Sequence, residues 1–177
     1  MYPIQNDVIN PMTFYVSNID FTPTCLCPGF DNQVLIGASD GQIYLHQFII
    51  TSNFWGTQQN LGDHVTKRLT SWTITNAIKS YFSFSVAPIY KICFDPSKSL
   101  IATIDNTQKI CIYFLENDSV SHLYTYHPPK GTKFASICCV ANSESYHLRF
   151  VAFTNSGDRF YFGTSDALVG KTGIALR

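Results

Sequence analysis

The chain has 177 residues, of which 45% are hydrophobic, 15% aromatic and only 14% charged, and its 12 basic residues balance its 12 acidic ones. This length fits one domain with a sizeable core, and the lack of a basic surplus argues against direct binding of nucleic acid. The aromatic content, with 14 Phe and 10 Tyr, exceeds what a small core normally holds and favours a protein that docks on partners.

The first predicted elements follow an irregular lead-in over residues 1–20, which has neither the basic nor the apolar region of a secretory signal. A short strand is predicted over residues 23–27. Residues 33–50 then read as a β-hairpin, because apolar runs flank a turn at Asp40 and Gly41, and glycine adopts the positive φ that tight turns require.

An insertion is predicted over about residues 51–87. Its first part, residues 51–67, is polar and contains glycine, which indicates a surface loop. Its second part, residues 69–84, fits an amphipathic helix whose apolar residues recur at helical spacing. These are Ile74, Ala77, Ile78, Tyr81 and Phe82. The polar side carries only the cation Lys79, so the helix either packs on its own protein or inserts aromatic and aliphatic side chains into loosely packed lipid.

The second half of the chain returns to β-structure. Apolar runs and turn residues predict strands at 89–94 and 134–140, hairpins ending at 115 and spanning 149–163, and loops at 95–98, 116–121 and 127–132. No stretch reaches the ~20 apolar residues of a membrane-spanning helix.

Three hairpins therefore recur along the chain, with turn centres at Asp40, Asp105 and Ser156 that lie 65 and 51 residues apart. Propeller blades of the WD40 and kelch kinds repeat every ~40 to 50 residues. The continuous apolar runs predict strands covered on both faces, as in stacked blades. The fold class is therefore predicted as all-β, a partial propeller of about three blades without the WD signature, with an ordinary β-sandwich as the alternative.

No residue pattern predicts a metal, a cofactor or a small-molecule substrate. The cysteines lie mostly inside apolar strands without zinc-ligand spacing and are interpreted as reduced core residues: Cys25, Cys27, Cys93, Cys111, Cys138 and Cys139. The histidines show no paired spacing and are interpreted as surface or edge residues: His46, His64, His122, His127 and His147.

The ordered hairpins and the insertion resemble one family. The most specific segments are GASDGQIY at residues 37–44 and FTNSGDRFYF at residues 153–162, both of which are turn and strand signatures. Together with the Trp-containing loop and the segment LTSWTITNAIKSYFSFSVAP, they are similar to the N-terminal β-propeller of the large inner-ring nucleoporins of the 155/170 class. The similarity spans roughly residues 21–164, the whole chain being interpreted as one partial propeller domain, 1–177.

The resemblance implies a structural scaffold of the nuclear pore complex that supports nucleocytoplasmic transport at the nuclear envelope. It implies linker and membrane-ring nucleoporins as partners, with the pore membrane surface as a further contact. In that family the propeller carries a Ser/Thr-rich amphipathic segment proposed to sense membrane curvature, and the matching segment is 69–84. The membrane-facing residues implied here are Leu69, Trp72, Ile74, Ile78, Tyr81, Phe82 and Phe84.

Two other classes of function remain open from the residues. One is a propeller adaptor that binds a peptide or protein on the blades without catalysis. The other is an enzyme that uses Asp40, Asp105, Asp158 and the histidines as acids and bases, although these aspartates lie in or beside hairpin turns, where bonding to the backbone already explains them. No nucleophile motif or phosphate loop supports catalysis, so the chain is predicted not to be an enzyme.

Overall fold

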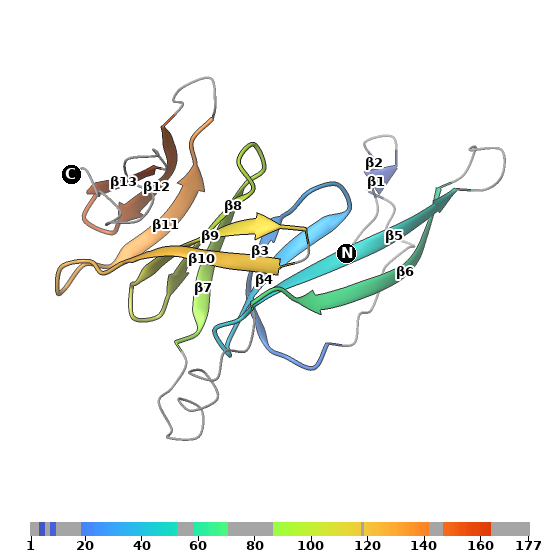
Figure 1. Ribbon diagram of the computed structural model, residues 1–177, viewed down its shortest axis with the longest axis horizontal. Helices are drawn as coiled ribbons and strands as arrows, with labels where there is room; N and C mark the ends of the chain where they lie inside the picture. Colours follow the sequence, from blue (N-terminus) through green and yellow to red (C-terminus); the bar gives the residue numbers. More distant parts are fainter. Residues whose placement is uncertain are drawn as a thin grey trace.

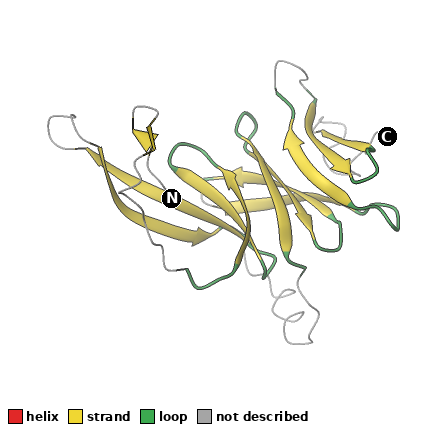
Figure 2. Ribbon diagram, turned by 180° about the vertical axis from the view of Figure 1, so that it is seen from behind, coloured by secondary structure: helices red, strands yellow, loops and turns green. Residues whose placement is uncertain are grey.

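The computed structural model describes the backbone of two short strands at residues 4–5 and 8–9 and then residues 19–52, 59–70, 87–117, 119–141 and 147–163. Side chains are described from residue 19 onward, except at 50–52 and 59–63. All regular elements in these ranges are strands (Figures 1 and 2). No helix long and apolar enough to cross a membrane occurs among them.

Three antiparallel sheets follow one another along the chain, and each is a meander in which neighbours in sequence are neighbours in the sheet. Blade 1 contains β3 (Pro23–Pro28), β4 (Gln33–Ala38), β5 (Ile43–Ser52) and β6 (Gln59–Arg68). Blade 2 contains β7 (Ile89–Asp95), β8 (Leu100–Asp105), β9 (Ile110–Glu116) and β10 (Ser119–Tyr126). Blade 3 contains β11 (Phe134–Cys139), β12 (Leu148–Thr154) and β13 (Arg159–Gly163). The separate pair β1 (Ile4–Gln5) and β2 (Val8–Ile9) lies within the segment that was expected to be irregular.

The first strands of the three blades lie next to one another. Strand β7 contacts both β3 and β11, so the inner edges of the blades meet while their later strands extend outward (Figure 1). The Thr24 hydroxyl on β3 donates a hydrogen bond to the Ile89 carbonyl on β7. After each outermost strand the chain returns to the innermost strand of the next blade, which is the connectivity of a β-propeller.

Two apolar cores fill the spaces between successive blades. Leu35, Ile43 and Leu45 of blade 1 pack with Phe94 and Ile101 of blade 2. On the other side of blade 2 the cluster is formed by Leu100, Ala102, Ile104, Ile110 and Ile112 with Phe134, Phe150, Ala152, Phe160 and Phe162 of blade 3. Adjacent residues of β8 therefore enter different cores, because alternate side chains of a strand point to opposite faces. The prediction that the central strands are covered on both faces is confirmed, and a two-sheet sandwich is excluded because the middle sheet is packed on both sides.

A buried ion pair joins blades 2 and 3. Arg149 at the start of β12 is fully buried, and its Nη1 lies 3.4 Å from Oδ2 of Asp95 at the end of β7. The same guanidinium nitrogen lies 3.3 Å from the Ser97 hydroxyl, and Nε donates to the Leu148 carbonyl at 2.9 Å. A buried charge needs such partners, so this contact fixes the relative placement of the two blades.

Two loop predictions were wrong. The segment 51–67 contributes most of β6, and 116–121 contains the start of β10. Both are the outermost strands of their blades, and β10 consists of exposed and half-buried residues without a fully buried one. A strand with that exposure needs no apolar run, so polar composition did not distinguish it from a loop.

Candidate interaction surface

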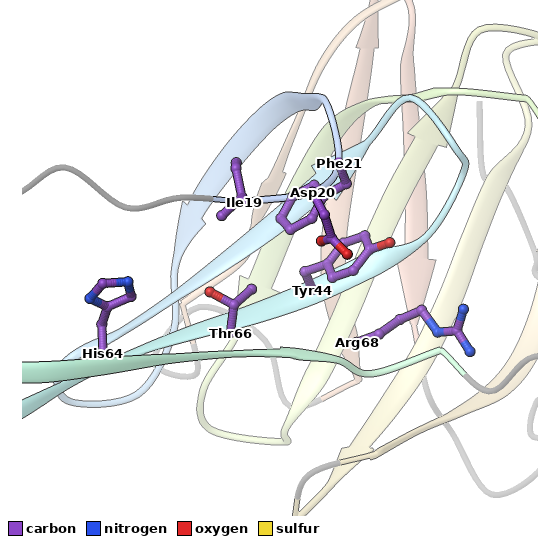
Figure 3. Close-up of a pocket in the computed structure, with 7 residues that line it drawn as sticks. All are labelled: Ile19, Asp20, Phe21, Tyr44, His64, Thr66 and Arg68. Atoms are coloured by element: carbon purple, nitrogen blue, oxygen red, sulfur yellow. The ribbon is translucent and has the colours of Figure 1, made fainter.

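An open groove of about 500 Å³ lies on blade 1, between the segment that leads into β3 and the outer strands β5 and β6 (Figure 3). We call it the blade 1 groove; it is lined by Ile19, Asp20, Phe21, Tyr44, His64, Thr66 and Arg68. Since Ile43 and Leu45 enter the core with blade 2, Tyr44 between them points to the opposite face. The groove is therefore on the face of blade 1 that is turned away from blade 2.

The strand register places the lining residues side by side. Tyr44 lies directly opposite Arg68, His46 opposite Thr66, and Phe48 opposite His64. Directly opposed residues of antiparallel strands point to the same face, so these three pairs form two adjacent rows. Figure 3 shows His64, Thr66 and Arg68 on one strand and Tyr44 on its neighbour.

An aromatic stack closes one end of the groove. The rings of Phe21 and Tyr44 are 3.7 Å apart between centroids and tilted by only 4°. The Tyr44 hydroxyl donates to Oδ2 of Asp40 at 2.7 Å, while the other carboxylate oxygen accepts the Gln42 N–H at 3.0 Å. Burial, followed by the hydrogen bond and charge of Asp40, raises the pKa of Tyr44 to about 12. Tyr44 is therefore protonated at physiological pH, and its hydroxyl is held in place by the hydrogen bond that it donates to Asp40.

A buried histidine lies next to the groove residues Thr66 and His64. His46 is 6% exposed, its Nδ1 lies 2.7 Å from the Thr66 hydroxyl, and its ring is 5.1 Å from that of His64. Burial, and then the neighbouring charge of His64, lowers the pKa of His46. The prediction that the histidines are surface or edge residues was therefore wrong for His46, which is buried on the groove face of blade 1.

Beyond this groove, a comparison of the whole sequence with protein-family models decides the family. The nucleoporin N-terminal family, described as Nup133 N terminal like, matches residues 14–176. The chain belongs to this family. No curated protein sequence matches it.

A solved structure supports the nucleoporin fold. The chain is similar to the Nup170 N-terminal domain of Chaetomium thermophilum, solved as a complex with Nup53, with a TM-score of 0.60 and 11% sequence identity. The match covers 90% of this chain and 24% of that chain, so the present sequence spans about a quarter of the length of its structural relative. The resemblance to large nucleoporins stated from the sequence is thereby confirmed at the level of the family and of the propeller-like fold.

The membrane-facing residues expected from this nucleoporin resemblance are largely outside the described residues. The structure describes only Leu69 among them, and that side chain is 2% exposed within the core between blades 1 and 2. Leu69 is therefore corrected to a core residue that closes blade 1. From residue 71 onward the expected helix at 69–84, with Trp72, Ile74, Ile78, Tyr81, Phe82 and Phe84, lies outside the described residues.

Two of the turn aspartates accept hydrogen bonds from backbone N–H groups of their turns. Oδ1 of Asp105 accepts the N–H groups of Thr107 and Lys109 at 2.8 and 3.0 Å, and Asp40 accepts that of Gln42. The Asp158 carboxylate accepts the Ser156 hydroxyl at 3.0 Å. The backbone contacts give Asp40 and Asp105 the turn-forming role expected from their positions, while the Asp158 carboxylate contacts a side-chain hydroxyl within its turn.

The cysteines are reduced, but the interpretation of all six as core residues was wrong. Cys93 is buried, whereas Cys138 and Cys139 are exposed. Strands β3, β7 and β11 nevertheless bring Cys27, Cys93 and Cys139 near one another, and burial followed by the nearby thiols raises the pKa of Cys93. No group of three or more ligand side chains suited to a metal ion occurs among the described residues.

Sequence reasoning missed the residues of the blade 1 groove. The sequence marks Tyr44 only as part of a turn and strand signature, and it places Thr66 and Arg68 in the predicted insertion. No spacing along the sequence signals this groove, because Phe21, Tyr44 and Arg68 come together only through the pairing of β5 with β6 and the approach of the lead-in segment.

Proposed function

We propose that the chain is a scaffold component of the nuclear pore complex that acts through the surfaces of its blades and without catalysis. The observation that carries this proposal is the family match over residues 14–176. Three successive blade sheets present the kind of surface that a binding scaffold uses. The Asp105 carboxylate accepts backbone N–H groups, so its turn role is explained without acid–base catalysis. Its location would be the nuclear envelope, at the pore.

The proposal extends to the inner ring and to a linker nucleoporin as the partner. Its support is the fold similarity to a Nup170 domain that was solved together with Nup53. The blade 1 groove offers a fixed aromatic stack, one exposed cation and one exposed carboxylate on an open face, features that suit an extended polypeptide segment.

The test is localisation together with binding. The fluorescently tagged chain should form a punctate rim at the nuclear envelope and should retain a purified linker fragment of the Nup53 kind. Replacing Tyr44 with Ala and Arg68 with Glu should weaken that retention about tenfold, while Lys91→Glu, at the exposed position of β7, should leave it unchanged. A diffuse signal together with capture of an unrelated soluble partner would instead favour the general propeller adaptor.

The membrane contact of residues 69–84 is a separate part of the proposal. With Leu69 held in the core, the segment that follows starts from a fixed point at the edge of blade 1. Its apolar residues Trp72, Ile74, Ile78, Tyr81, Phe82 and Phe84 would insert into lipid of high curvature.

Replacement of one apolar residue tests this contact. Ile78→Asp should abolish flotation of the chain with small, highly curved liposomes, since a charge on the inserted face opposes burial in acyl chains. Thr75→Asp, on the polar side of the expected helix, is the matched control and should retain flotation. Wild-type protein that ignores these liposomes would refute the membrane contact without affecting the scaffold proposal.

A further inference from the structure

A second cavity, of about 590 Å³, lies between blades 2 and 3. One wall is the crossover loop of residues 127–133, which joins β10 to β11, and the other is the turn of residues 155–158 between β12 and β13 (Figure 1). We call it the crossover pocket. Its volume is within the range of about 300 to 1,000 Å³ that is typical of ligand pockets.

Backbone contacts hold both walls in place. Gly131 has a φ of 92°, which reverses the loop, and the Thr132 N–H donates to the Pro129 carbonyl at 3.1 Å. The Asn155 N–H donates to the Lys133 carbonyl at 3.0 Å, which ties one wall to the other. A pocket whose walls are fixed in this way loses little conformational entropy when it binds a ligand.

The floor of the pocket is aromatic. Tyr126 and Phe160 line it, with ring centroids 6.0 Å apart, and Tyr126 is only half-buried. The edge of the Tyr126 ring packs against Phe162, which belongs to the core between blades 2 and 3. The floor can therefore receive an apolar side chain on a rigid base.

The rim of the pocket is cationic. Lys130 and Lys133 both line it, both are exposed, and neither has an ion-pair partner among the described residues. The facing carboxylate, Asp158, accepts the hydroxyl of Ser156 at 3.0 Å, so part of its hydrogen-bonding capacity is used within the turn. Two ammonium groups against one such carboxylate leave the rim with a net positive charge that suits an acidic ligand.

We propose that the crossover pocket binds a short acidic peptide segment, with one apolar or aromatic side chain on the floor and flanking carboxylates at Lys130 and Lys133. A peptide is favoured over a lipid surface because the aromatic floor lies between two loops and can receive a side chain, whereas lipid headgroups present anions without such a side chain. The proposal relies on the scaffold function only for the source of the peptide, namely a partner protein. The pocket itself is independent of the blade 1 groove, with which it shares no residue.

Fluorescence polarisation with the whole chain tests this proposal. The probe is a fluorescein-labelled peptide of sequence GSEEFEESG, and the control probe is GSQQFQQSG. The acidic probe should bind with an affinity that falls as salt is raised, and the neutral probe should bind at least about tenfold more weakly.

Variants locate the site. Lys130→Glu with Lys133→Glu should weaken binding of the acidic probe at least about tenfold, and so should Asn155→Trp, which fills the mouth from an exposed turn position without changing charge. Lys91→Glu, the same kind of exchange at an exposed position outside the pocket, is the control and should bind like wild type. Unchanged thermal unfolding of the Lys130/Lys133 variant would show that its fold is intact.

Several results would overturn the proposal. Equal binding of the two probes would remove the acidic specificity, and unchanged binding by the Lys130/Lys133 variant would move the site elsewhere. Flotation with phosphatidylserine vesicles that depends on these lysines, without binding of the acidic probe, would replace the peptide with a lipid surface. Because these measurements use purified chain and synthetic peptides, they can fail while nuclear-rim localisation succeeds, and the reverse.

Discussion

Tyr44 shows how a turn residue and a groove residue can be coupled through one carboxylate. Asp40 closes the β4–β5 turn by accepting the Gln42 N–H with one oxygen, and with the other it accepts the Tyr44 hydroxyl. Burial and this acceptor both disfavour the phenolate, so the pKa of Tyr44 rises from 10.0 to about 12. The turn thus keeps the groove tyrosine protonated.

The pH dependence follows from this direction. A folded-state pKa above the unfolded value means that the contribution of Tyr44 to stability is fully present below pH 10.0 and is lost as the pH rises towards about 12. Subtracting the ultraviolet phenolate titration of Tyr44→Phe from that of wild type should reveal one group with a midpoint near the upper value. Asp40→Asn should lower that midpoint, and an unchanged midpoint would show that Asp40 has no influence on the ring.

At the scale of single elements, the hairpins depend on side chains that replace missing backbone partners. In the β8–β9 turn, Oδ1 of Asp105 accepts three bonds, from the Thr107 N–H, the Thr107 hydroxyl and the Lys109 N–H, at 2.8, 2.7 and 3.0 Å. Gln108 adopts a φ of 69° in this turn. Such a strained residue persists only where its surroundings fix it, and here its side chain also accepts the Phe134 N–H at 2.7 Å.

Removing the Asp105 acceptor should therefore weaken blade 2. Asp105→Ala should lower the free energy of unfolding by about 1 to 2 kcal/mol, since donors at the turn lose their acceptor. Asp105→Asn retains one carbonyl oxygen and should lose less than half of that. Urea denaturation measures both, and an alanine variant as stable as wild type would contradict the role assigned to this carboxylate.

At the scale of the whole molecule, two apolar cores and a buried ion pair join the described parts of the blades. The Asp95–Arg149 contact is the charged link between blades 2 and 3, and Asp95 also forms its own turn through the Ser97 N–H at 3.0 Å. Because both charges are buried, removing Asp95 takes a buried charge partner away from Arg149, whereas removing both side chains leaves an interface that can be filled with apolar atoms.

A double-mutant cycle tests this link. Asp95→Asn keeps the turn bonds but leaves the Arg149 charge buried, and it should lower the free energy of unfolding by about 3 kcal/mol. Arg149→Met in the same background should restore part of that loss. Urea denaturation of the two single variants and the double variant gives the coupling energy, and strictly additive effects would show that the two side chains do not stabilise each other.

The sequence by itself determined the three hairpins and their turn residues, because strands such as β8 are buried on both faces and so consist of continuous apolar runs. It also determined the turn role of Asp40 and Asp105, since that role is satisfied within a few residues. Only the tertiary structure revealed β6 and β10, whose exposed outer positions require no apolar signal, and placed His46 and Leu69 in the interior. The blade 1 groove and the crossover pocket likewise arise from residues far apart in sequence, and strand pairing and blade stacking brought them together through contacts that no local pattern encodes.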